Sequence, residues 1–175
     1  MRIICYLLYY GFARHLPRSY EFYFAGRLAA RFRAFLCRRL FEESGQIFVV
    51  ERKADFGTGK KIIMKENACL GENVRVIGMG TVTIGRHTMM GPDVLLITDN
   101  HSFNSKEFLG YSSGSIVIGD HAWIGARTII LKDVTIGDYA IVGAGAVVSK
   151  DIPEFSIAVG NPARVVKSRK NQQNS

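Results

Sequence analysis

The sequence predicts an all-β solenoid, a parallel β-helix of about five coils, on three observations. Between residues 118 and 148 an aliphatic residue recurs every six positions, glycine follows most of these residues, and a small residue stands four places beyond. The six aliphatic residues are Ile118, Ile124, Ile130, Ile136, Val142 and Val148. The five small or short residues are Ala122, Thr128, Val134, Ala140 and Ala146.

A period of six fits neither the 3.6-residue period of an α-helix nor simple strand alternation. If each hexad is one short strand plus a corner, the aliphatic side chain points into a prism and the small residue fills the space beside it. We expect the glycine after the aliphatic residue to occupy the corner, where a side chain would be strained. Three hexads then close one triangular coil, and stacked coils bury a continuous aliphatic ladder.

Earlier hexads extend the solenoid towards the N-terminus. Residues 46–61 are expected to form a lead-in strand and turn, and two sets of hexads follow, separated by a two-residue slip within VIGMGTVT. The first set is Met64, Leu70 and Val76, and the second is Ile84, Met90 and Leu96. The hexads then stop over residues 101–115, a polar segment rich in glycine and serine that predicts a long loop extruded from the prism.

The N-terminal segment, residues 1–45, predicts an amphipathic helix. Between residues 20 and 43, apolar side chains recur at three- and four-residue steps, and arginines occupy the other sides. The apolar positions are Phe24, Leu28, Phe32, Phe35, Leu36 and Leu40. Two roles stay open: a cap on the open end of the solenoid or on a neighbouring subunit, which we favour, and an anchor at an anionic membrane surface.

The charge distribution argues against a specific nucleic-acid partner. The chain of 175 residues has a formal net charge of +8, but residues 46–163 carry eleven basic and twelve acidic residues. The excess lies in residues 1–45, with eight arginines and three glutamates, and in residues 164–175, with four basic residues and no acid. We expect three segments: 1–45, helical; 46–166, the β-helix; and 167–175, a basic tail.

The sequence favours a cytoplasmic protein, with possible peripheral contact at the inner membrane face. The apolar run at residues 3–13 is shorter than the ~20 residues that a membrane span needs. No small-residue cleavage site of a signal peptide follows it. Cys5, Cys37 and Cys69 are odd in number and widely spaced, which indicates reduced thiols that act as small apolar side chains.

The hexads, followed by AVGNPARVV at residues 158–166, resemble the hexapeptide-repeat acyltransferases. Within that family the chain is most similar to the bacterial sugar and polysaccharide O-acetyltransferases. The resemblance implies a left-handed β-helix, an exception to the usual handedness of crossovers between parallel strands. It also implies acetyl-CoA as co-substrate, no metal, and a homotrimer whose active sites lie between subunits.

Acetyl transfer to a hydroxyl requires a base for the hydroxyl proton, and the resemblance assigns that role to His101, the first residue after TDN. Asp99 and Asn100, just before it, are the expected substrate-binding residues. Imidazole suits the role because it accepts a proton near neutral pH. His87 and His121 are expected to face outward, and no close histidine pair of the kind used by solenoid zinc enzymes is present, so no metal site is expected.

The resemblance places the coenzyme along the C-terminal coils. Trp123 would line the cleft, and the backbones of Ala126 and Ala144 would bind the pantetheine arm. Ser149 and Lys150 would meet the adenosine end, while Arg164 and Lys167 would contact the nucleotide phosphate, for which cationic side chains are suited.

The acceptor is less defined by these motifs. The maltose and galactoside enzymes carry an asparagine about thirty residues before the base, where this chain has Gly71 and, nearby, Asn73. The Asp-Ile-His-Pro element of serine acetyltransferases is absent. The expected acceptor is therefore a sugar of a capsule, exopolysaccharide or lipopolysaccharide precursor. A small-molecule O-acetyltransferase and a non-catalytic scaffold remain alternatives.

Overall fold

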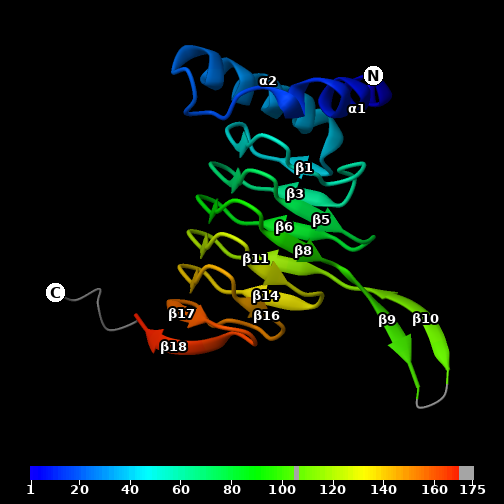
Figure 1. Ribbon diagram of the computed structural model, residues 1–175, viewed down its shortest axis with the longest axis vertical. Helices are drawn as coiled ribbons and strands as arrows, with labels where there is room; N and C mark the ends of the chain where they lie inside the picture. The colour runs from blue at the N-terminus through cyan, green and yellow to red at the C-terminus, as the bar shows by residue number, and fades with distance from the viewer. Residues whose placement is uncertain (105–106, 170–175) are drawn as a thin grey trace.

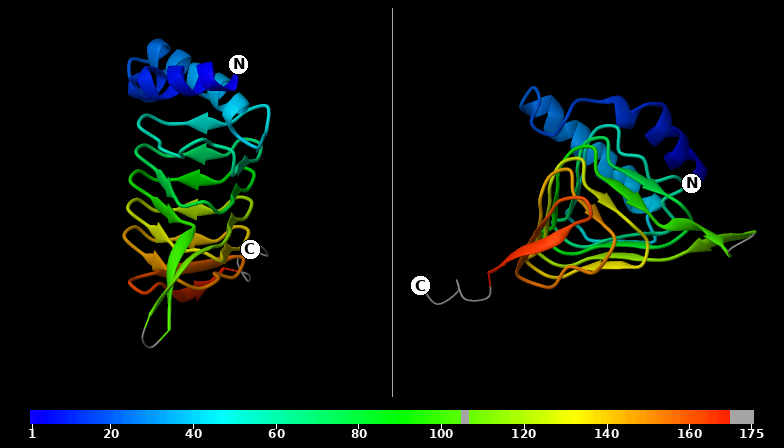
Figure 2. Two further views of the ribbon diagram at one scale, coloured as in Figure 1. Left: turned by 90° about the vertical axis from the view of Figure 1, so that its right-hand side faces the viewer. Right: turned by 60° about the horizontal axis from the view of Figure 1, so that its bottom comes forward.

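The computed structural model describes residues 1–104 and 107–169, and the arrangement is a triangular β-solenoid closed at one end by two helices (Figure 1). Five coils cross all three faces of the prism and a sixth is incomplete, against the expected total of about five. The coils form a left-handed parallel β-helix, as the resemblance implies. Figure 2 shows the triangular cross-section when the prism is viewed obliquely from its C-terminal end.

Parallel strands of two to four residues build the three faces, and one antiparallel strand, β18, follows the last of them. The first face contains β1 (Glu43–Ser44), β3 (Ile62–Met64), β6 (Val82–Ile84), β11 (Ile116–Ile118) and β14 (Val134–Ile136). The second contains β2 (Val49–Val50), β4 (Cys69–Leu70), β7 (Met89–Met90), β12 (Trp123–Ile124), β15 (Ile141–Val142), β17 (Ser156–Val159) and β18 (Arg164–Ser168). The third contains β5 (Arg75–Ile77), β8 (Leu95–Ile97), β13 (Ile129–Ile130) and β16 (Val147–Val148).

The hexad residues form the interior of the prism, as predicted. Ile124 and Ile130 have no exposed surface, and Ile118 and Val142 are 1% exposed. Parallel register stacks Ile124 on Met90 and Val142, and Ile130 on Leu96 and Val148. The small residues that stand four places after each aliphatic residue are buried as well. Among them, the hydroxyl of Thr128 donates a hydrogen bond of 2.8 Å to the carbonyl oxygen of Gly125.

The expected reason for the hexad glycines was wrong. The left-handed backbone conformation falls three places after the aliphatic residue, as at His121 (φ +56°) and Arg127 (φ +58°), rather than at the glycine. The glycine is needed because neighbouring coils approach closely there. A Cβ atom on Gly125 would lie 2.5 Å from the backbone nitrogen of Ala144 in the next coil.

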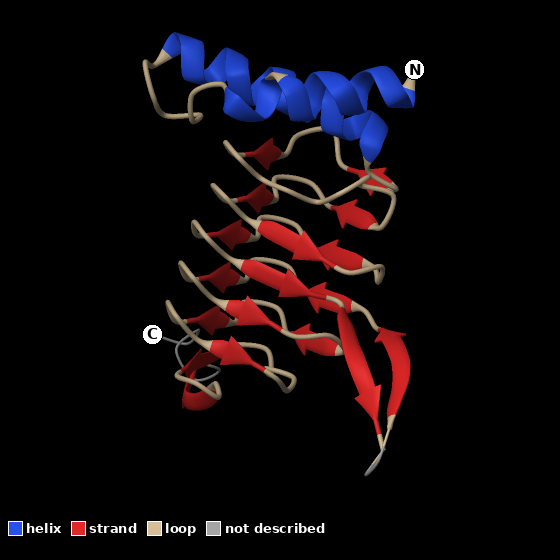
Figure 3. Cartoon of the chain, turned by 45° about the vertical axis from the view of Figure 1, so that its right-hand side comes forward, coloured by secondary structure: helices blue, strands red, loops and turns tan. Residues whose placement is uncertain are grey.

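The long segment expected to be a loop is a β-hairpin. β9 (Asp99–Phe103) and β10 (Phe108–Ser113) pair antiparallel and project from the corner between the third and first faces (Figures 1 and 3). The two-residue slip is accommodated one coil earlier at the same corner, where Gly78 has a φ of +112°. A Cβ atom on Gly80 would collide with the carbonyl oxygen of Gly114, so the two interruptions of the repeat stack directly on each other.

The N-terminal end is closed by α1 (Arg2–Gly11), the short 3₁₀ helix η1 (Ala13–His15) and α2 (Phe24–Leu40). The longer helix begins later and ends earlier than the predicted span of residues 20–43. Figure 3 shows α1 and α2 lying across the end of the solenoid. Both helices bury a stripe of side chains; that of α1 includes Cys5 and Tyr9, and that of α2 includes Leu36, Cys37 and Leu40. The capping role is therefore present in the structure.

A buried arginine joins α2 to the first coil. Arg33 is fully buried and donates from Nε to the carbonyl oxygen of Val50 at 2.7 Å and from Nη1 to that of Pro17 at 2.9 Å. Its Nη2 lies 3.5 Å from Oε2 of Glu51, whose carboxylate also accepts from the backbone N–H of Ser19. Burial lowers the pKa of Arg33, and the Glu51 carboxylate opposes that shift.

The three cysteines are free thiols. Cys5 and Cys37 lie in the buried stripes of α1 and α2, and burial raises the pKa of Cys69 to about 12. A thiol with a raised pKa is a poor nucleophile because the thiolate is the reactive form. The cysteines therefore serve as small apolar side chains, as expected.

Candidate functional site

The hairpin positions His101 outside the prism wall. In the register of β9 and β10, His101 lies opposite Tyr111, and the centroids of their rings are 4.7 Å apart. The ring of Phe108 lies 5.4 Å from the imidazole. The backbone N–H of His101 donates to the side-chain oxygen of Asn100 at 2.8 Å. The imidazole is thus exposed on a two-stranded arm and flanked by two aromatic rings.

An open hollow of about 440 Å³ lies at the base of this arm. Its wall combines residues of β5 and β8 with residues of the hairpin. It is lined by Ile77, Gly78, Ile97, Asp99, Asn100, His101 and Tyr111. The structure therefore brings together the three residues that the sequence assigned to the base and the acceptor: His101, Asp99 and Asn100.

Asp99 is held in place at the rim of the hollow. Its carboxylate accepts a hydrogen bond of 2.9 Å from the backbone N–H of Met79 in the preceding coil, and lies 3.4 Å from the hydroxyl of Thr98. The Met79 N–H lowers the pKa of Asp99, and the hydroxyls of Ser113 and Thr98 add to this effect. The close approach also requires Gly78, because a Cβ atom there would lie 2.6 Å from the carboxylate.

The residues assigned to the thioester arm of the coenzyme lie on the second face and at its corner with the third. Trp123 is 51% exposed on β12, between Met89 and Ile141 of the neighbouring strands. Ala126 and Ala144 occupy the same corner in successive coils. The carbonyl oxygen of Ala126 accepts from the N–H of Gly145 at 2.8 Å, whereas neither alanine N–H donates to another described group. Two backbone donors therefore remain available along this corner.

The C-terminal motif closes the last coil against β16. The N–H of Val147 donates to the carbonyl oxygen of Gly160 at 3.0 Å, and the N–H of Ala163 donates back to Val147 at 2.8 Å. Ser149 and Lys150 are exposed directly after β16. Arg164 and Lys167 are exposed on β18, so the expected tail boundary at residue 167 falls within a strand that pairs antiparallel with β17.

One chain displays His101 and most of the assigned coenzyme residues on different surfaces. The hairpin leaves the prism at the end of β8, on the third face, whereas Trp123 and β18 belong to the second. Figure 2 shows the hairpin and β18 leaving the triangle on opposite sides. Trp123, β18 and the corner of Ala126 and Ala144 are thus displayed on a different surface of the prism from His101, whereas Ser149 and Lys150, directly after β16, lie at the corner from which the hairpin projects.

Two groups of residues were missed in the sequence. Tyr111 faces His101, and the signal for it was a pairing register between residues 99–103 and 108–113 that a loop assignment ignored. His87 and His121 face outward, as expected, but their rings also stack at 4.8 Å. Tyr139 and Phe155 continue this stack on the next coils. His87, His121 and Tyr139 stand three places after a hexad aliphatic residue, which was the available signal for these three. Phe155 stands three places after Ile152, which lies outside the six-residue phase but pairs with Ile136.

Residues 1–104 and 107–169 contain no group of three or more histidine, cysteine, aspartate or glutamate side chains that could hold a metal ion. Within the same residues, no helix is long and apolar enough to cross a membrane.

Comparison with known proteins places this geometry in a family. The family model described as bacterial transferase hexapeptide (six repeats) matches residues 115–150. The chain is 30% identical over 139 residues to a protein of Escherichia coli named as the colanic acid biosynthesis acetyltransferase WcaF, covering 79% of this chain and 76% of that protein.

Two solved structures share the fold and the repeat. A maltose O-acetyltransferase from Clostridium difficile superposes with a TM-score of 0.77 at 31% identity, covering 95% of this chain and 85% of that one. A hexapeptide-repeat acetyltransferase from Vibrio cholerae, in complex with acetyl coenzyme A, has a TM-score of 0.69 at 31% identity and covers 79% of this chain and 77% of that one. The chain is an acetyltransferase and belongs to the hexapeptide-repeat acetyltransferase family.

Proposed function

We propose that the protein transfers the acetyl group of acetyl-CoA to a hydroxyl of a sugar in a capsule, exopolysaccharide or lipopolysaccharide precursor. The observation that carries this proposal is the exposed His101 beside Asp99 and Asn100, at the rim of an open hollow. Relatives named for colanic acid biosynthesis and for maltose O-acetylation support a sugar acceptor. The bound acetyl coenzyme A of the Vibrio cholerae structure supports the donor.

In this reaction His101 acts as the general base. A neutral imidazole takes the proton from the acceptor hydroxyl as its oxygen attacks the thioester carbonyl carbon. The tetrahedral intermediate then collapses, the carbon–sulfur bond breaks, and the thiolate takes the proton to give free coenzyme A and the acetyl ester. No covalent bond to the enzyme forms at any step.

Asp99 and Asn100 suit the acceptor because carboxylate and amide groups bind sugar hydroxyls through directional hydrogen bonds. The free N–H groups of Ala126 and Ala144 suit the carbonyl oxygens of the pantetheine arm, which lies extended along the corner. Arg164 and Lys167 on β18 suit the phosphates at the other end, with Ser149 and Lys150 beside the adenosine.

The active site forms between two copies of the chain in a trimer. His101 lies on a different face of the prism from Trp123 and β18, so a cyclic assembly lets the hairpin of one subunit reach the second face of the next. This arrangement predicts that a monomer lacks a complete site. Light scattering during an activity assay tests it, and an active monomer would overturn it.

His101→Ala tests the base. Release of coenzyme A thiol, measured with acetyl-CoA and a panel of sugar acceptors, should fall by roughly 10²–10⁴-fold while acetyl-CoA still binds. His87→Ala is the matched control, because that imidazole is also exposed but lies on another corner, and it should keep wild-type turnover. Wild-type turnover by His101→Ala would refute the assignment of the base.

Subunit complementation tests the shared site. Ala144→Trp fills the pantetheine corner, and His101→Ala lacks the base, so neither homotrimer should turn over. Co-expressed chains that share sites between subunits should recover about one quarter of the wild-type sites, because each site then draws its two halves independently. No recovery in mixed trimers would place both halves of the site in one chain.

A further inference from the structure

The capping helices carry a second apolar face that the solenoid does not cover. On α1, Cys5 and Tyr9 are buried, and the hydroxyl of Tyr9 donates to the carbonyl oxygen of Ala54 at 2.9 Å. At 100° per residue, Ile3, Ile4 and Leu7 fall on the opposite side of the helix. Their side chains are 75%, 61% and 62% exposed, so α1 is apolar both towards the coils and away from them.

The same division holds for α2, where the outer face also carries positive charge. Phe24, Leu28 and Phe35 lie opposite the buried stripe and are 71%, 47% and 48% exposed. Four arginines flank them: Arg27, Arg31, Arg38 and Arg39. Neither α1 nor α2 contains an acidic residue. Apolar residues between arginines are typical of helices that lie in the headgroup region of a bilayer.

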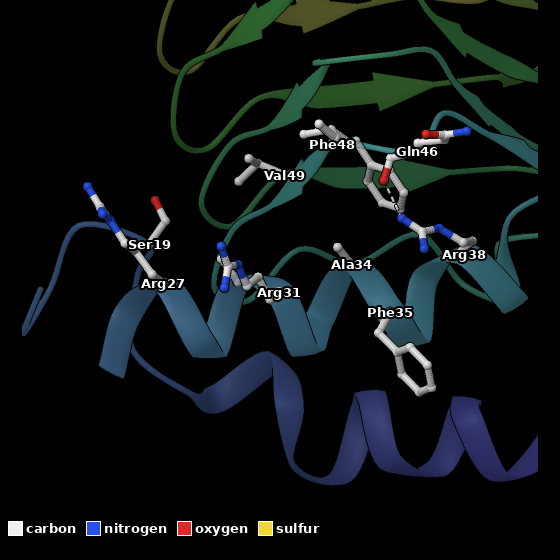
Figure 4. Close-up of a pocket in the computed structure, with 11 residues that line it drawn as sticks. Ser19, Arg27, Arg31, Ala34, Phe35, Arg38, Gln46, Phe48 and Val49 are labelled. Atoms are coloured by element: carbon white, nitrogen blue, oxygen red, sulfur yellow. Dashed lines mark hydrogen bonds between the residues drawn. The ribbon is translucent and has the colours of Figure 1, made fainter. Parts of the chain in front are cut away.

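A groove of about 610 Å³ borders this outer face, between α2 and the first coil (Figure 4). Arg27, Arg31 and Arg38 line it beside Phe48 and Val49, and its lining residues include no carboxylate. Figure 4 shows Arg31 and Arg38 on the groove side of α2 and Phe35 on the side away from the coils. Arginine side chains in this position can meet phosphate oxygens in a bidentate manner.

The turn before α2 presents three more aromatic side chains. Tyr20, Phe22 and Tyr23 are 70%, 79% and 75% exposed, and Phe22 and Tyr23 have φ angles of +50° and +40°. A positive φ is uncommon for a bulky residue and costs conformational energy. The strained turn thus displays aromatic rings at the same end of the molecule as α1 and α2.

We propose that α1, the turn at residues 20–23 and α2 form a docking face for a bilayer containing anionic phospholipids. The apolar and aromatic side chains lie at the boundary between headgroups and acyl chains, and the arginines contact lipid phosphates. Charge complementarity selects this partner, because residues 1–45 carry eight arginines and three glutamates while the coils are close to neutral. The face lies at the far end of the prism from β18 (Figure 1), so docking leaves the coenzyme end exposed.

Vesicle co-sedimentation with the full chain tests the proposal. The wild-type protein should sediment with vesicles of phosphatidylcholine containing about 30% phosphatidylglycerol, and binding should weaken with salt and on pure phosphatidylcholine. Phe24→Ser with Phe35→Ser, and separately Ile4→Ser with Leu7→Ser, should reduce binding at least about tenfold. Val165→Ser with Val166→Ser is the matched control, since it removes two exposed apolar side chains at the opposite end of the prism.

Arg27→Gln with Arg31→Gln separates the charge contribution. This variant should lose the salt-sensitive part of the binding, and circular dichroism should show that all variants remain folded. Unchanged binding by the serine variants, or no sedimentation of the wild type, would contradict the proposal. A change in molar mass by light scattering without a change in vesicle binding would identify a second copy of the chain as the occupant. Because the readout is binding to lipid, its result is independent of acetyl transfer.

Discussion

The prism wall and the helical cap bury apolar side chains by different rules. In the wall, position within the hexad decides the environment, so Ile124 and Ile130 have no exposed surface, whereas Trp123 at an outward position is 51% exposed and Ile129 is half-buried. In the cap, residues of one chemical type divide between two environments, since Leu36 is buried and Leu7 is 62% exposed. A repeat therefore specifies the burial of each residue, whereas an apolar helix can bury one face and expose apolar side chains on the opposite face.

The two regions also differ in how their stability is distributed. Each coil of the wall contributes similar aliphatic contacts to its two neighbours, so no single layer holds the prism together. The cap, besides its buried apolar stripes, has one buried arginine that joins α2, residues 16–17 and the first coil. Substitutions in the two regions test this difference.

The largest loss is expected for Arg33→Met. The change leaves Glu51 with a buried charge and removes the donor for three backbone carbonyl groups, which should lower the free energy of unfolding by about 3–5 kcal/mol. Urea denaturation measures the loss. Arg31→Met, on the exposed side of the same helix, should change it by no more than about 0.5 kcal/mol. Equal losses in the two variants would show that the cap does not depend on Arg33.

Ile124→Ala should cost about 2–5 kcal/mol, because it leaves a cavity in a fully packed coil. The neighbouring coils hold the backbone in register, so the solenoid should still fold. Ile129→Ala, at a half-buried outward position, should cost about 1 kcal/mol or less. Thermal melting of the two variants measures the contrast, and a reversed order would contradict the assignment of inward and outward positions.

A smaller difference in stability is expected between alanine substitutions at two glycines. Gly125→Ala places a Cβ atom 2.5 Å from the Ala144 nitrogen, and this overpacking should cost about 1–3 kcal/mol. The same change should weaken acetyl-CoA binding, which isothermal titration measures, because it shifts the corner assigned to the pantetheine. Gly11→Ala meets no atom within 4 Å at the end of α1, so it should be neutral or stabilising by up to about 1 kcal/mol.

The smallest effect concerns pH. The folded pKa of Asp99 is lowered below its unfolded value, so its stabilising contribution is present above an unfolded pKa of about 3.9 and is lost as the pH falls through the folded value. Melting temperatures between about pH 5 and pH 2 should therefore fall less steeply for Asp99→Asn than for the wild type. Identical slopes would show that the Met79 hydrogen bond to this carboxylate does not contribute to folding.

Much of the wall could be predicted because a period of six relates each residue to its coil. The stack of Ile118, Ile136 and their counterparts follows directly from that period, and so does the outward position of His121. The reason for the glycines could not be predicted, because it depends on the distance between coils rather than on the conformation of one residue. The stacking of the His87 and His121 rings could not be predicted either, since the residues of the hairpin separate the two histidines in the sequence.

For the candidate site, the resemblance assigned the base to His101, and the sequence shows that His101, Asp99 and Asn100 stand where the repeat stops. The roles of these three residues stay a prediction. The sequence did not identify Tyr111, which depends on the pairing register of the hairpin, or the Met79 N–H, which depends on how two interruptions of the repeat stack at one corner. The coenzyme residues remain a proposal drawn from the resemblance, supported by the two unused N–H groups at Ala126 and Ala144.

By itself, the sequence determined the solenoid, its interior and the place where the repeat is interrupted, because short-range periodicity encodes all three. Only the tertiary structure decided that the long insertion pairs as a hairpin, that His101 and Trp123 lie on different faces, and that the capping helices keep a second apolar face exposed. These features depend on contacts between residues far apart in the chain, and no local pattern of residues specifies such contacts.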